Sequence, residues 1–259
     1  YAASGSGRGV DLNNDVIAAS GTVSMTGQHN TGATYALSLS GSTSITAGTG
    51  VTLESLNNNT GTIALLSSGG INGGSGTVLM RAANYAFGGA DRTITTTGVL
   101  TIQPDADENS FASSFDNQYL NPVSVTGLTL GKSSNASAIT LSRAISLSGP
   151  VSIYGGSIDV NANITANSGN ILLDADTGST LNQSSTGILL DDAITIETVT
   201  SGNLTLIGRS GDTGSGFDGI DASSANTTTL RSAGNLTLQG YSYAASGSGR
   251  GVDLNNDVI

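Results

Sequence analysis

The sequence predicts an all-β protein, a parallel β-helix or solenoid with about nine coils per repeat, from two observations. A short unit that reads turn residue, apolar, any, apolar recurs nine times along the 259 residues. The first seventeen residues also return unchanged as the last seventeen. Apolar residues two positions apart are typical of β-strands, and self-similarity at a long period is typical of solenoids and arrays.

The nine recurring units are the first expected strands. In each of them two aliphatic residues flank a middle residue, and seven of the nine middle residues are Ser or Thr. One face of each strand is therefore apolar and the other mostly polar. The nine units are residues 21–25, 50–53, 76–80, 98–102, 127–130, 149–153, 169–173, 202–206 and 234–238. Further alternating runs, such as residues 35–39 and 62–66, predict two or three strands in each coil.

The identical ends predict the domain organisation. Residues 1–17 and 243–259 both read YAASGSGRGVDLNNDVI, so residues 1–242 are one β-helical repeat unit and residues 243–259 begin the next. The nine strand units fill this period at about 27 residues per coil. We expect the chain to be a window on a tandem array that continues in both directions.

An array of β-sandwiches or barrels is the alternative fold, because it also has short strands and Gly-rich turns. Sandwich strands are joined in hairpins, whose two-residue turns favour Asn-Gly or Asp-Gly. Such dipeptides are rare in this sequence. The pattern therefore favours stacked coils.

Composition argues against several classes of function. The net charge of −11 and the pI near 4.1 disfavour nucleic acid or an anionic membrane as a partner. No apolar stretch approaches the 18 residues of a membrane span, so we expect no membrane insertion. The chain has no Cys and a single His, His29, which disfavours nucleophilic catalysis. Carboxylate pairs occur at Asp105/Asp107, Asp174/Asp176 and Asp191/Asp192, but without a His or a basic cluster beside them. We expect no enzyme activity.

Aromatic residues in the longest loop form the candidate interaction patch. In residues 103–122, Phe111, Phe115 and Tyr119 stand four positions apart, which predicts one face of a short helix begun near Asn109 and stopped by Pro122. Two interpretations stay open: the helix packs on the flank of the coils as a lid, or its aromatic face binds a ligand or a neighbouring fibre. On either interpretation, deletion of residues 108–119 should leave the coils intact.

The same loop contains the one candidate for a metal site. Residues 105–109 read DADEN, like the start of a calcium loop, and Asp116 stands at the twelfth position. Ser110 occupies the place where such a loop needs Gly, and the last ligand is Asp rather than Glu. We therefore expect surface carboxylates and no cofactor, with Ca²⁺ as the alternative.

The stretch GLTLGKSSNASAITLSRAISLSGPVSIYGGSIDVNANITANSGNILLDA, residues 127–175, is preceded by LTIQP and followed by GNLTLIGRSG. In its style of repeat it resembles the repeat regions of giant bacterial surface adhesins of the filamentous-haemagglutinin type. Those proteins are secreted, right-handed β-helical proteins that form long stalks or surface fibres. The resemblance implies a right-handed β-helix at the cell surface or outside the cell, and no catalytic residues.

The expected function is therefore that of a structural segment of an extracellular fibre or adhesin stalk. A stiff rod of stacked coils would project from a cell surface, link cells or support a biofilm. The expected partner is the chain itself, through covalent tandem repeats and lateral bundling of fibres. The alternative function is a carbohydrate- or partner-binding adhesin module that uses the loop around residues 103–122 to bind surface glycans.

Overall fold

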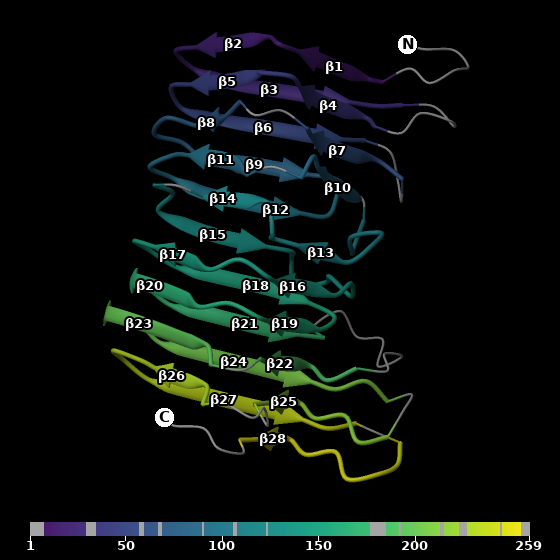
Figure 1. Ribbon diagram of the computed structural model, residues 1–259, viewed down its shortest axis with the longest axis vertical. Helices are drawn as coiled ribbons and strands as arrows, with labels where there is room; N and C mark the ends of the chain where they lie inside the picture. The colour runs from purple at the N-terminus through teal and green to yellow at the C-terminus, as the bar shows by residue number, and fades with distance from the viewer. Residues whose placement is uncertain are drawn as a thin grey trace. The chain divides into compact units, whose positions relative to one another are not determined.

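The computed structural model shows an all-β chain (Figure 1). It describes residues 8–29, 35–56, 60–66, 69–89, 91–105, 108–122, 124–176, 185–191, 193–212, 215–222, 227–243 and 245–254. These residues form 28 strands and no helix, and the strands pair in parallel. The predicted parallel β-helix is confirmed. It consists of two compact units, one of Tyr1–Ser113 with Tyr119–Thr129 and one of Ser114–Gln118 with Leu130–Ile259.

The first unit has three parallel sheets, and successive turns of the chain add strands to each of them. One sheet contains β1 (Val10–Asn13), β4 (Leu37–Ser40), β7 (Thr62–Leu65) and β10 (Asn84–Phe87). The next contains β2 (Val16–Ala19), β5 (Ser44–Ala47), β8 (Ile71–Asn72), β11 (Arg92–Thr95) and β14 (Leu120–Pro122). The third contains β3 (Thr22–Gly27), β6 (Gly50–Ser55), β9 (Val78–Arg81), β12 (Val99–Gln103) and β15 (Gly127–Leu130), of which Leu130 belongs to the second unit.

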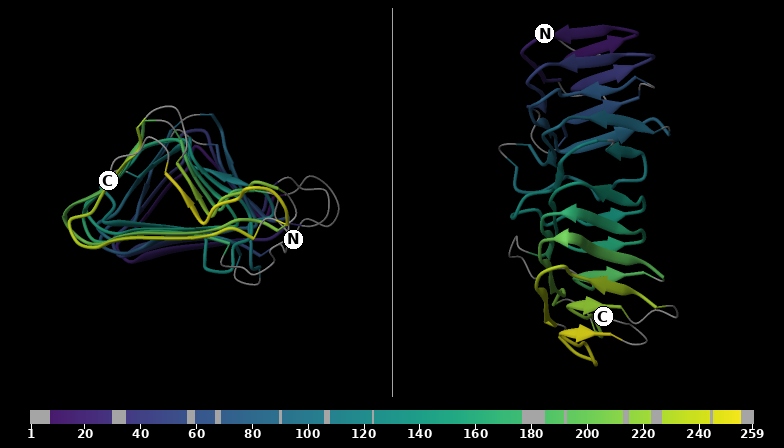
Figure 2. Two further views of the ribbon diagram at one scale, coloured as in Figure 1. Left: turned by 90° about the horizontal axis from the view of Figure 1, so that it is seen from below. Right: turned by 90° about the vertical axis from the view of Figure 1, so that its left-hand side faces the viewer.

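The second unit repeats this plan (Figure 2). One sheet contains β13 (Phe115–Asp116), β16 (Ile139–Leu141), β19 (Ile158–Val160), β22 (Ile188–Leu190), β25 (Ile220–Asp221) and β28 (Val252–Asp253). Another contains β17 (Ile145–Leu147), β20 (Ile164–Ser168), β23 (Thr195–Ser201) and β26 (Thr229–Arg231). The last contains β18 (Val151–Gly155), β21 (Ile171–Ala175), β24 (Leu204–Arg209) and β27 (Leu236–Tyr241).

All nine strand units predicted from the sequence are strands. Five of them, β3, β6, β9, β12 and β15, lie in the third sheet of the first unit, and four, β18, β21, β24 and β27, lie in one sheet of the second. Each turn of the chain contains one of them, so the nine predicted coils are present. The flanking aliphatic residues stack in register from coil to coil, as Leu173 does on Leu206, and both of these are fully buried. Each such burial stabilises the fold by about 1.5–3 kcal/mol.

A ladder of asparagines explains the recurring Gly-Asn before these strands. The backbone N–H of Asn203 donates to Oδ1 of Asn170 at 2.8 Å, and the N–H of Asn235 donates to Oδ1 of Asn203 at 2.8 Å. The glycine before Asn203 is also required, because Gly202 has φ +112° and a Cβ there would lie 1.9 Å from the Gly169 carbonyl oxygen. The motif thus binds each coil to the previous one through a side chain and a close backbone approach.

The helix predicted over residues 109–122 does not form. The segment instead contains two short strands, β13 (Phe115–Asp116) and β14 (Leu120–Pro122), with bends and a turn around them. Residues four apart share a face of a strand as well as a face of a helix, so the aromatic spacing does not by itself specify a helix. The side chains of Phe111 and Phe115 are buried, 3 % and 4 % exposed, and the segment is part of the core rather than a lid.

Candidate functional site

The three aromatic residues of the candidate interaction patch do not form an exposed surface. In the first unit, the buried Phe111 ring packs edge-to-face on Tyr85, with 5.8 Å between ring centroids. In the second unit, Phe115 lies on β13 in register with Ile139 of β16. Tyr119 is half-buried, and its carbonyl oxygen accepts a hydrogen bond from the Arg92 N–H at 2.8 Å. The structure therefore uses two of the three side chains for packing.

Tyr85 is anchored in the same part of the first unit. Its hydroxyl donates to the carbonyl oxygen of Gln103 at 2.9 Å, which satisfies the polar end of a half-buried ring. Burial, the largest cause, raises the pKa of Tyr85 well above its ordinary value. This phenol therefore stays protonated and serves as a hydrogen-bond donor, not as an acid.

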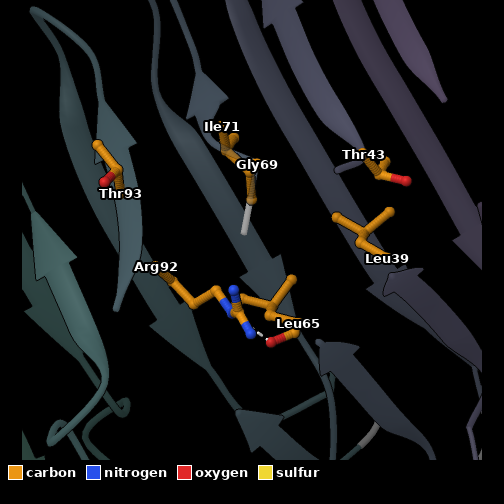
Figure 3. Close-up of a pocket in the computed structure, with 7 residues that line it drawn as sticks. All are labelled: Leu39, Thr43, Leu65, Gly69, Ile71, Arg92 and Thr93. Carbon is orange, nitrogen blue, oxygen red and sulfur yellow. Dashed lines mark hydrogen bonds between the residues drawn. The ribbon is translucent and has the colours of Figure 1, made fainter. Parts of the chain in front are cut away.

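A buried guanidinium borders the pocket of the first unit shown in Figure 3. Arg92, at the start of β11, is 4 % exposed, and its Nε donates to the Leu65 carbonyl oxygen at 2.5 Å. Its Nη1 is buried without a hydrogen-bond partner. Burial lowers the pKa of Arg92 from its ordinary value. The pocket is mainly apolar and is lined by Leu39, Thr43, Leu65, Gly69, Ile71, Arg92 and Thr93.

The second unit has an acidic column on the outward face of the sheet that begins with β13. Successive strands place one outward residue in register, and four of these six residues are aspartates. In order they are Asp116, Thr140, Asp159, Leu189, Asp221 and Asp253. Burial raises the pKa of Asp159, and the neighbouring Asp191 and Asp116 raise it further, against a hydrogen bond from Asn161 that lowers it.

At the end of this column three carboxylates converge. Asp218, Asp221 and Asp253 each have an oxygen within 4.8 Å of the others, an arrangement that could hold a cation. Arg250 already meets part of this charge, because its Nη1 pairs with Asp253 and its backbone N–H donates to Asp218. Sequence reasoning missed this group because Asp253 is far from the other two in the chain. The available signal was the spacing Arg-x-x-Asp, which occurs in both copies of the repeated segment.

The other acidic residues singled out from the sequence are distributed differently. Asp105 is buried, 1 % exposed, whereas Asp116 is exposed and accepts a hydrogen bond from the Ser142 hydroxyl at 3.1 Å. Of the predicted pairs, Asp174 binds Arg209 at 2.8 Å, and Asp107 and Asp192 lie outside the described residues.

In the part of the chain that the structure describes, no helix is long and apolar enough to cross a membrane. Comparison with models of protein families, with curated proteins and with solved structures finds no match for this chain. The sequence repeat and the stacked coils are therefore the basis for assigning its function.

Proposed function

We propose that this chain is a structural segment of an extracellular fibre or adhesin stalk. One observation carries the proposal: nine similar strand units recur through one complete sequence repeat, and within each unit successive coils pair in parallel. A solenoid of this kind is stabilised by nearest-neighbour contacts, so identical repeats can be added without a change of plan.

The mechanical role follows from how the coils are bonded. Parallel strand pairing, the buried aliphatic ladder and the asparagine ladder all act between successive coils. A single coil does not bury enough apolar surface to offset the cost of ordering its backbone, about 1–2 kcal/mol per residue. Stacked repeats supply that burial. The array would therefore behave as a stiff rod.

The location and partners are proposed from the repeat style of residues 127–175. Its resemblance to filamentous-haemagglutinin-type adhesins supports a cell-surface or extracellular fibre that projects from cells, links them or strengthens a biofilm. The net charge of −11 opposes lateral contact between rods. Bundling of fibres would therefore need divalent cations or another attraction.

Electron microscopy of the native material tests the proposal. Nine coils at the strand spacing of about 4.8 Å predict an axial repeat of about 43 Å, with a strong spacing near 4.8 Å along the axis. Discrete beads at a longer spacing, with strands across the axis, would contradict it. The glycan-binding alternative gains no support from residues 103–122, because Phe111 and Phe115 are buried.

A further inference from the structure

The five-residue sequence Arg-Gly-Val-Asp-Leu occurs once in each unit, at residues 8–12 and 250–254. The two copies have different neighbours. Residues 8–12 belong to the first unit and lead through β1, which is at one end of its sheet. Residues 250–254 belong to the second unit and lead through β28, which is at one end of another sheet. We call this five-residue sequence the junction segment.

In the second unit the junction segment binds the coil that precedes it. The Ile220 N–H donates to the Gly251 carbonyl oxygen at 3.0 Å, and the Ala222 N–H donates to the Asp253 carbonyl oxygen at 2.9 Å. The Arg250 N–H donates to the Asp218 carboxylate. The carbonyl groups of Gly251 and Asp253 therefore point to the preceding coil.

In the first unit the same segment binds the coil that follows it. The Val10 N–H donates to the Ala36 carbonyl oxygen at 3.0 Å. The Leu12 carbonyl oxygen accepts a hydrogen bond from the Ser40 hydroxyl at 3.2 Å. The Arg8 guanidinium lies 5.5 Å from the centroid of the Tyr35 ring, a cation–π contact.

These two sets of contacts use different atoms of the junction segment. The preceding coil forms hydrogen bonds with backbone groups of the segment's first, second and fourth residues. The following coil forms hydrogen bonds with the amide of the third residue and the carbonyl of the fifth, and it contacts the Arg side chain. This division is expected, because successive residues of a strand direct their backbone groups to opposite neighbours. One copy can therefore make both sets at once.

The two copies also agree in conformation and in the face that they present. The Arg–Asp ion pair is present in both, as Arg8 with Asp11 at 2.7 Å and as Arg250 with Asp253. In each copy the Val residue is in register with an inward, fully buried residue. Val10 pairs with Leu37 of the following coil, and Val252 pairs with Ile220 of the preceding coil.

We propose that a single junction segment joins two successive repeats, with the last coil of one repeat on one edge and the first coil of the next on the other. The partner surface is a second copy of this repeat, and the proposal rests on the proposed tandem array.

Hydrogen exchange of single amides tests this without a mutation. The two chains to compare are the 259-residue chain and a two-repeat chain in which residues 1–242 precede the complete sequence. In the two-repeat chain the Val252 N–H should donate to the second repeat's counterpart of Ala36. Its exchange should slow by at least about tenfold relative to the single chain. The Ala222 amide is the internal control, because its partner is the Asp253 carbonyl oxygen in both chains.

Val252→Pro removes the amide that would bind the next repeat. In the two-repeat chain it should lower the urea midpoint and restore fast exchange at the first coil of the second repeat, while in the single chain it should leave the midpoint unchanged. Val252→Ala, which keeps the amide, is the matched control and should leave those exchange rates slow in the two-repeat chain. Equal exchange of Val252 in both chains would overturn the proposal.

The tandem-array proposal can fail separately from the junction proposal. Native material without an axial repeat would contradict the array, even if the engineered junction protected Val252. A fibre with a 43 Å repeat, built of nine coils at about 4.8 Å, but with unprotected Val252 in the two-repeat chain would contradict the junction alone.

Discussion

Arg209 holds the Asp174 carboxylate at 2.8 Å, whereas Asp176, two residues further along the chain, has both carboxylate oxygens buried without a hydrogen-bond partner. Arg209 also donates from Nη1 to the Ala175 carbonyl oxygen at 3.0 Å, so this guanidinium spans the backbone between the two aspartates. Burial raises the pKa of Asp176; the charge of Arg209 lowers it, and that of Asp212 raises it further. Asp174 is therefore paired with a counter-ion, whereas ionisation of Asp176 destabilises the folded state.

Asp176→Asn should stabilise the second unit at neutral pH. A carboxyl whose pKa is raised in the folded state binds its proton more tightly there, so its contribution to stability falls as pH rises above the ordinary value of 3.8. The gain from the variant should therefore be small near pH 3.8 and reach roughly 1–3 kcal/mol at neutral pH. Asn also tolerates the left-handed conformation of this position, φ +58°. Urea unfolding as a function of pH measures the difference.

Asp174→Asn is the matched control for this experiment. It removes the carboxylate that binds Arg209, so it should destabilise the protein modestly, by about 1 kcal/mol or less, since both side chains are partly exposed. If both variants shifted the midpoint in the same direction, the difference assigned to the two aspartates would be wrong.

Leu204→Asp should break the stacking of coils in the second unit. Leu204 is fully buried and in register with Ile171 and Leu236 on the two neighbouring strands. An aspartate there would be a buried charge without a partner, and we expect a loss of at least about 4 kcal/mol, or no folding. Thr205→Asp places the same side chain on the outward face of β24 and should cost about 1 kcal/mol or less. Circular dichroism during thermal unfolding compares the two, and equal losses would contradict the inward ladder.

The turn glycine of the asparagine ladder should resist replacement. Gly202→Ala puts a side chain at φ +112° and a Cβ 1.9 Å from the Gly169 carbonyl oxygen, so the backbone of one coil has to move. We expect a loss of about 2 kcal/mol or more. Gly21→Ala is the control, because a Cβ at Gly21 would meet nothing within 4 Å. That variant should be neutral or slightly stabilising, and a similar loss in both variants would contradict the assignment of the loss to the backbone conformation and close approach at Gly202.

The coils were predictable from the sequence because their signal is local and repeated. A Gly-rich turn followed by aliphatic residues at alternate positions, as in GNLTL at residues 202–206 and 234–238, has one common interpretation in a parallel stack. The strands of the other two sheets gave a weaker signal, since some are only two residues long, such as Ile71–Asn72. Their position follows from pairing with the previous coil rather than from their own pattern.

The candidate site could not be predicted in the same way. The convergence of Asp218 and Asp221 with Asp253 depends on the register of β25 and β28, which no local pattern specifies. The burial of Arg92 is equally non-local, because an arginine in a polar Thr-rich stretch is usually exposed. The prediction of a helix in the aromatic loop was wrong for another reason: a four-residue spacing is common to helices and strands.

Phe115 provides the sharpest test of that loop. Its side chain is 4 % exposed, and it sits in register with Ile139, so it starts the core of the sheet that runs from β13 in the second unit. Phe115→Ala should cost about 3–5 kcal/mol through lost burial and the cavity left behind. Ser114→Ala, at the exposed neighbouring position, should change stability by less than about 0.5 kcal/mol. Urea midpoints measure both. The sequence alone predicts that residues 108–119 can be removed without damage to the coils, whereas buried Phe115 predicts that this deletion destabilises the second unit. An unchanged midpoint for Phe115→Ala would restore the view of this segment as an accessory loop whose aromatic rings are available to a partner.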